Sequence, residues 1–129
     1  MRPLMIAAAL TGLLLVAAGA SGGHTVPIEA TSRWQTAFMY GYVHALGALV
    51  AATLPFRGWV HLAGGWAFIA SVPLFSGVQI AKIMLGGIPM TPTPLDGLTF
   101  LVPVGGVFFI VGWLMIGLAA ALAPRRDAT

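Results

Sequence analysis

The chain has 129 residues, of which 59% are hydrophobic and only 7% are charged, and its formal net charge is +3. Soluble domains carry about 25% charged residues, so this composition excludes an ordinary soluble enzyme and predicts an integral membrane protein. The absence of cysteine excludes disulfides and thiolate metal sites, and the scattered basic residues form no patch for nucleic acid, which we do not expect as a partner.

Four stretches are long and apolar enough to cross the ~30 Å hydrocarbon core of a bilayer. They cover about residues 4–22, 34–54, 62–85 and 98–123. Backbone polar groups in lipid must be satisfied within each segment, so these stretches should be helices. We therefore predict an all-α membrane protein, a bundle of four transmembrane helices with short loops, in which residues 1–129 form a single domain.

The first stretch has a second interpretation, because a charged Arg2, an apolar run and the small residues 18–20 are typical of a signal peptide. The run is longer than the apolar region of most signal peptides, so we expect it to be retained as a span.

Orientation follows from the basic residues near the helix ends. With four spans, both termini and the middle loop share one side of the membrane. That side carries Arg2, Arg57, Arg125 and Arg126, and the other side carries Arg33 and Lys82. Because the side with the termini carries more basic residues, we predict that both termini are cytoplasmic. Arginine outnumbers lysine five to one, which is typical of a GC-rich bacterial genome and suggests the bacterial inner membrane.

Small residues on the predicted spans mark faces where helices can approach closely, which is the basis of helix association in lipid. The candidates for packing or an interface are Gly41, Ala45, Ala48, Gly77, Gly105, Gly106 and Gly112. This pattern fits a compact bundle, and it equally fits faces that dock on a partner.

A proline in the middle of the third predicted span, Pro73, lacks the N–H that a helix needs and should kink it. Ser71 or Ser76 is placed to satisfy the freed carbonyl. The kink is either a fixed packing feature, which we favour, or a hinge or binding notch.

Three histidines raise the question of a haem or metal site. His24 follows the first span, His44 lies about 15 Å into the second, and His61 lies near the opposite membrane face. These depths differ, so two of them cannot ligate one haem iron within a chain, and zinc would need more convergent ligands. We expect no metal site.

His44 is the most interesting of the three, since an ionisable group deep in a bilayer is a functional candidate by default. Its structural interpretation is a hydrogen bond to a backbone carbonyl, to Tyr40 or to a serine. Its functional interpretation is a proton relay or a contact to a quinone. His24 is a weaker candidate for cofactor binding, and it is better explained as a helix cap or a headgroup contact.

Lys82 lies about one turn from the end of its span, where its ammonium can reach the interface and pair with Asp96 or Glu29. No predicted span contains an acidic residue, which argues against a proton-coupled exporter. No serine, histidine and acid cluster supports a hydrolase. We therefore predict that the protein is not an enzyme and has no catalytic residues.

Four blocks of residues resemble a small membrane family known as domain-of-unknown-function family 423, with YgdD-like and transmembrane protein 256-like members. They are residues 19–24, 42–46, 74–77, and 103–106 with 112–113. The family pattern has histidines at the positions of His24 and His44. The resemblance implies four transmembrane helices and a membrane location, and it implies no activity.

The leading functional hypothesis is a non-catalytic accessory or structural subunit of a larger bacterial membrane complex, for which a bioenergetic or electron-transfer assembly is one host. Its expected partners are membrane lipid and other integral membrane subunits, and we expect bound lipid but no cofactor. The alternatives are a small oligomeric transporter or channel and a membrane protein that contacts haem or quinone through His44.

Overall fold

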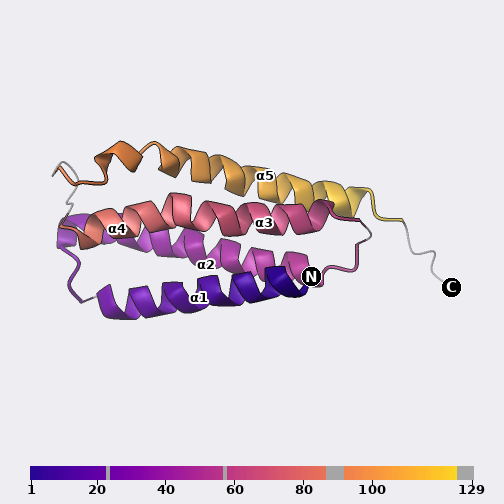
Figure 1. Cartoon of the computed structure of the whole chain (residues 1–129), viewed down its shortest axis with the longest axis horizontal. Coiled ribbons are helices and arrows are strands. Elements are labelled where there is room, and N and C mark those ends of the chain that lie inside the picture. The colour runs from indigo at the N-terminus through magenta and orange to yellow at the C-terminus, as the bar shows by residue number, and fades with distance from the viewer. Residues whose placement is uncertain (23, 57, 87–91, 125–129) are drawn as a thin grey trace.

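The computed structural model describes residues 1–22, 24–56, 58–86 and 92–124, and within these ranges its regular elements are all helical (Figure 1). The α-helices are α1 (Arg2–Gly22), α2 (Thr31–Thr53), α3 (Val60–Val72), α4 (Val78–Met84) and α5 (Leu101–Ala121). A π-helical turn, η2 (Pro73–Gly77), joins α3 to α4 in one continuous run. The described residues thus form four helices of membrane-spanning length and hydropathy, and the predicted fold class is confirmed.

The helix ends follow from proline and glycine. Leu54 has extended backbone angles (φ −62°, ψ 134°) because it precedes Pro55, and the residue before a proline is disfavoured in a helix. Gly86, just after α4, has a φ of 82°, the left-handed conformation in which helices commonly end. Short 3-10 turns precede two of the long helices: η1 (Ile28–Ala30) leads into α2, and η3 (Asp96–Leu98) lies before α5.

The spans have the lengths that a bilayer requires. α1 and α5 have 21 residues each, or about 31 Å at 1.5 Å per residue, which matches the hydrocarbon thickness. α2 begins at Thr31 rather than near Trp34, because η1 starts the helical run directly after Pro27. Helix ends are the part of a span that hydropathy specifies least.

Pro73 produces a local change of helix type. The backbone N–H of Val78 donates to the carbonyl of Pro73, five residues earlier, which defines a π turn. The Ser71 hydroxyl donates to the Phe68 carbonyl at 2.9 Å. The Ser76 hydroxyl, by contrast, is buried and has no partner among the described residues.

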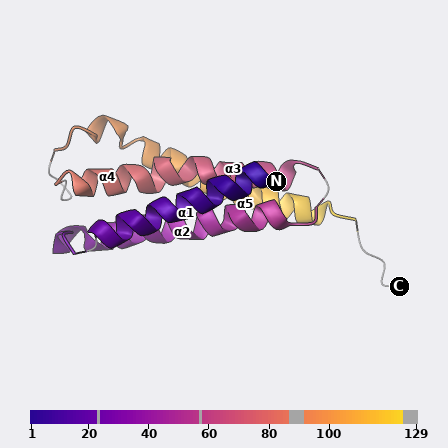
Figure 2. The same cartoon turned by 60° about the horizontal axis from the view of Figure 1, so that its bottom comes forward.

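α3 occupies the centre of the arrangement. It packs against α5 on one side and against α2 on another, and α1 packs mainly on α2. Figure 1 shows α5 along one edge of the molecule and α1 along the other, and Figure 2 shows α1 running beside α2. The N-terminus and the last turn of α5 lie at the same end of the bundle. Because α2 and α5 both flank α3, side chains rather than backbones bridge the space between them.

The buried core is built mostly from alanines and aromatic rings. Its members include Leu4, Ala8, Leu15, Trp34, Ala37, Phe38, Ala45, Ala48, Ala52, Phe68 and Phe109. α1 and α5 turn large apolar side chains outward, for example Leu14 at 68% exposure and Leu114 at 67%. Such faces are stable in lipid, where an outward leucine costs nothing.

Candidate functional site around His44

His44 lies on α2 with its side chain inside the bundle, at 5% exposure. Its Nδ1 is 2.7 Å from the backbone carbonyl oxygen of Tyr40, one turn earlier on the same helix. Its Nε2 accepts a hydrogen bond of 3.1 Å from the indole Nε1 of Trp113 on α5. Of the partners that the sequence suggested, the backbone carbonyl is the one His44 uses, and Trp113 is a second partner that the sequence did not suggest.

These two bonds define the state of the ring. An indole nitrogen is only a donor and a carbonyl oxygen only an acceptor. Nε2 must therefore offer its lone pair to Trp113, and Nδ1 must carry the proton that Tyr40 receives. His44 is thus a neutral imidazole with both nitrogens engaged, and neither nitrogen is free to ligate a metal or to relay a proton without breaking a bond.

Aromatic rings surround the imidazole. Phe109 of α5 stacks on it with ring centroids 3.6 Å apart and planes 20° from parallel. Tyr40 lies nearly parallel to it at 5.9 Å, and Phe68 of α3 meets it edge-on at 5.0 Å. Three helices therefore hold the ring, and His44 serves as the polar centre of an aromatic cluster that joins α2 to α5.

A groove of about 570 Å³ opens beside this cluster. It is lined by Tyr40, Val43, His44, Phe75, Pro103, Gly106, Val107, Phe109, Ile110 and Trp113. A smaller hollow of about 140 Å³ adjoins it and shares Tyr40, Val43 and His44. The lining is aromatic and apolar, so the groove is suited to an apolar ligand that carries few polar atoms.

The other two histidines do not join His44. His24 is exposed in the turn after α1. His61 is buried near the start of α3, where its Nδ1 has no partner among the described residues and its ring meets Phe56 edge-on at 5.8 Å. Within the described ranges, no group of three or more metal-ligating side chains converges.

The small residues singled out from the sequence fall into two groups. Ala45 and Ala48 are buried, and a Cβ on Gly41 would lie 3.0 Å from the methyl groups of Leu15 on α1. By contrast, a Cβ on Gly77 would meet only its own turn, and one on Gly106 would come no closer than 3.9 Å to the Phe75 ring. Gly77 and Gly106 therefore do not lie at close helix contacts, whereas Gly41 does.

The tightest helix contact is between α3 and α5. A Cβ on Gly112 would lie 2.4 Å from the Phe68 ring and 3.0 Å from the carbonyl oxygen of Gly64, and one on Gly64 would lie 2.7 Å from the Gly112 carbonyl oxygen. A Cβ on Gly105 would lie 2.7 Å from the backbone nitrogen of Phe75. These glycines let α5 approach α3 closely, and this approach brings Trp113 within reach of His44.

Lys82 closes the opposite end of the bundle. Its ammonium lies 2.8 Å from a carboxylate oxygen of Asp96 and donates to the Thr99 hydroxyl at 2.9 Å. The sequence offered Asp96 and Glu29 as partners, and the structure shows Asp96. The pair ties the end of α4 to the segment that leads into α5.

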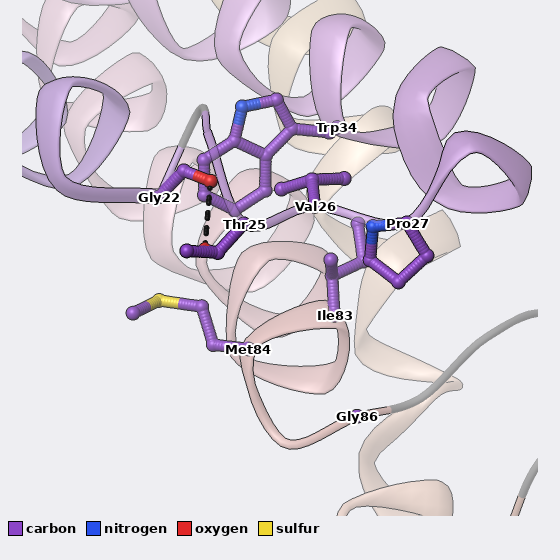
Figure 3. A pocket seen from close by; sticks show the side chains of 8 residues that line it. All are labelled: Gly22, Thr25, Val26, Pro27, Trp34, Ile83, Met84 and Gly86. Atoms are coloured by element: carbon purple, nitrogen blue, oxygen red, sulfur yellow. Dashed lines mark hydrogen bonds between the residues drawn. The ribbon is translucent and has the colours of Figure 1, made fainter.

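A second hollow, of about 210 Å³, lies at the same end, between the last residues of α1 and α4 (Figure 3). Trp34 covers one side of it, and the Thr25 hydroxyl donates to the Gly22 carbonyl at 3.1 Å. A Cβ on Gly22 would lie only 2.4 Å from the nearest atom of the Trp34 ring, so glycine lets this ring approach the end of α1. The Thr25 hydroxyl is therefore already engaged and is not offered to a ligand. We interpret this hollow as a packing gap where α1 ends beside α2.

The family model for a protein of unknown function, DUF423, matches residues 17–106. The chain belongs to this family. The UPF0382 membrane protein YwdK of Bacillus subtilis is 34% identical over 93% of this chain and 97% of its own length. The UPF0382 membrane protein SSP2132 of Staphylococcus saprophyticus is 30% identical over 90% and 94%. No solved structure matches the chain. The family resemblance is thereby confirmed, and this DUF423 protein is a multi-pass membrane protein.

Proposed function

We propose that this DUF423 protein is a non-catalytic accessory subunit of a larger complex in the bacterial inner membrane. One observation carries the proposal. α5 is held by α3 on one side, and its other side exposes Gly117, whose Cβ position has no neighbour within 4 Å, with Ala121 exposed one turn later. Small residues four apart on a lipid-facing helix favour docking of another transmembrane helix, and a single chain leaves this face unused.

The polar side chains inside the bundle support a structural role. The hydroxyls of Thr11 and Ser71 and the amide of Gln79 all donate to carbonyls of their own helix, at 2.8 to 3.1 Å. His44 is equally engaged. Such locally bonded groups do not form a polar path, which disfavours the alternative of a small oligomeric transporter or channel. Membrane lipid is the expected neighbour of the remaining outward faces.

The same proposal places both termini in the cytoplasm. The N-terminus and the end of α5 lie at one end of the bundle, and Arg2 lies at that end, while Lys82 and Asp96 lie at the other. A green fluorescent protein fused to the C-terminus should fluoresce, and alkaline phosphatase fused there should be inactive. The reverse pattern would invert the orientation.

The test of the subunit role uses the tagged chain expressed in its native membrane and extracted in mild detergent. We expect it to migrate with a large assembly on a native gel and to co-purify with the same integral membrane proteins in constant ratio. Gly117→Leu should release it from that assembly. Gly12→Leu should not, although it makes the same change at a position on α1 that also has no neighbour within 4 Å.

Two results would contradict the proposal. The first is that the chain migrates alone or as a small oligomer of itself. The second is that Gly117→Leu stays in the assembly as firmly as Gly12→Leu. In the first case the transporter alternative moves forward. It predicts ion or solute flux through proteoliposomes that His44→Ala abolishes.

A further inference from the structure

We propose that the groove between α2 and α5 binds the ring of an isoprenoid-type quinone, with the Tyr40 hydroxyl donating a hydrogen bond to a ring carbonyl. The notable feature is which polar group remains free. Both nitrogens of His44 and the indole N–H of Trp113 are used within the chain. Tyr40 lines the same groove, and none of the hydrogen bonds found among the described residues involves its hydroxyl. The inference does not depend on the accessory-subunit role.

The depth of Tyr40 in the membrane decides whether its hydroxyl can find a partner outside the chain. Tyr40 lies seven residues beyond Arg33 on the helical run, or about 10 Å along the axis. The interfacial layer on each side of a bilayer is only about 5–8 Å thick. With Arg33 at headgroup level, Tyr40 starts inside the hydrocarbon, where acyl chains offer no acceptor. Its 39% exposure is therefore exposure to lipid, and an unpaired hydroxyl there is costly.

The walls of the groove favour a flat ring over a flexible chain. The rings of Tyr40 and Phe75 lie 4.8 Å apart, and Phe109 stacks on His44, so the lining is a set of aromatic faces and edges. Stacking on aromatic rings adds to the energy of apolar burial. Gly106 lines the groove without a side chain, and a Cβ there would lie in ordinary contact with the Phe75 ring, at 3.9 Å.

The length of the groove fits a ligand that enters from one leaflet. Its lining on α5 extends from Pro103 to Trp113, ten residues or about 15 Å, which is half the hydrocarbon thickness. Pro103 is near the end of the bundle where Lys82 pairs with Asp96. An isoprenoid quinone matches this site: one of its two ring carbonyls accepts from the Tyr40 hydroxyl, and its ring face and apolar tail lie against the apolar lining.

The experiment measures binding of decylubiquinone to the purified chain in nanodiscs of phosphatidylethanolamine and phosphatidylglycerol, by saturable quenching of tryptophan fluorescence. Tyr40→Phe removes only the hydroxyl and should weaken binding about threefold to tenfold, the range for one hydrogen bond. Gly106→Leu fills the groove and should weaken it by about tenfold or more. Tyr42→Phe and Gly117→Leu make the same changes outside the groove lining and should bind like the unmodified chain.

Several outcomes would overturn the inference. Quenching that does not saturate, or that is equal in all variants, would show collision without binding. Binding that survives in Tyr40→Phe at full strength would remove the hydroxyl from recognition. Native mass spectrometry provides the second readout: phosphatidylglycerol retained by the unmodified chain, lost in Gly106→Leu and not displaced by decylubiquinone would make the groove a phospholipid site. Far-UV circular dichroism of each variant shows that the fold is retained.

Discussion

The hydrogen bond from Trp113 to His44 should be a measurable link between α2 and α5. Trp113→Phe removes the indole N–H and leaves Nε2 of His44 without a donor. A buried acceptor without its partner costs about 1–3 kcal/mol, whereas interhelical hydrogen bonds in membrane proteins average about 0.6 and reach about 1.7 kcal/mol. The bond is 3.1 Å long and its acceptor is 5% exposed within a spanning helix, so water competes little. We expect a coupling energy of about 1 kcal/mol.

A double-mutant cycle isolates this coupling from the loss of packing. The cycle compares Trp113→Phe, His44→Leu and the double variant, and the non-additive part of the unfolding free energy is the coupling. Unfolding is followed by far-UV circular dichroism in mixed micelles with increasing dodecyl sulfate, a signal that does not depend on the replaced tryptophan. A control cycle of Trp113→Phe with Tyr42→Phe, whose hydroxyl lies near Gly19 of α1, should be additive within about 0.3–0.5 kcal/mol.

A His44 cycle as additive as the control would show that the bond between Trp113 and His44 contributes no coupling. A second observable is independent of stability. Nitrogen chemical shifts of a labelled His44 should show the proton on Nδ1 and a bare, hydrogen-bonded Nε2. A proton on Nε2 would mean that the indole does not donate to this ring, and the link between α2 and α5 would then be packing alone.

Three further predictions concern stability, each measured by the same unfolding assay. Gly112→Ala places a methyl group against Phe68 and the fixed carbonyl of Gly64, and it should cost about 1–3 kcal/mol. Gly117→Ala, in open space, should be neutral or stabilise by up to about 1 kcal/mol, and equal effects would contradict the close approach. Ser71→Ala should cost about 1 kcal/mol because its bond to Phe68 is lost. Ser76→Ala should cost less, or stabilise, because that hydroxyl has no partner among the described residues, and a larger loss than for Ser71→Ala would show that it is bonded. Lys82→Met should cost less than about 1 kcal/mol, since Asp96 is 50% exposed in the pair. A larger loss of stability would show that the ion pair fixes the segment before α5 onto the end of α4.

Much of the fold could be predicted from the sequence because one property decides it. Each span is a long apolar run, and the bilayer fixes the length of such a run and its helical state. The rotation of each helix is a different matter. Apolar residues lie on all sides of α5, so no polar face shows which side packs inward. Gly112 and Gly117 both lie in apolar stretches that give no sign of which one is buried. A Cβ on Gly112 would lie against Phe68, whereas a Cβ on Gly117 would have no neighbour within 4 Å.

The site was predictable only where partners are close in sequence. His44 and the Tyr40 carbonyl are one helical turn apart, and bonding of a polar side chain to the carbonyl four residues back is a recurrent local pattern in helices. Trp113 lies 69 residues further along, and its pairing depends on the approach of α5 to α3. Phe109 and Phe68 were missed for the same reason. The only signal in the sequence was the spacing of Phe109 and Trp113 by four residues, which places both on one face of α5.

The proline in the third span connects the packing of the bundle to the groove. The sequence left open whether the kink at Pro73 is a packing feature or a binding notch. Pro73 begins the turn η2, and η2 carries Phe75, whose backbone nitrogen lies against Gly105 of α5. The Phe75 ring then reaches Tyr40 at 4.8 Å and Phe109 at 5.5 Å and becomes one wall of the groove. Phe75 lies inside this π turn, so the position of its ring depends on a backbone that departs from α-helical geometry. The two interpretations are therefore compatible, because the same π turn that packs against α5 also contributes a wall of the groove.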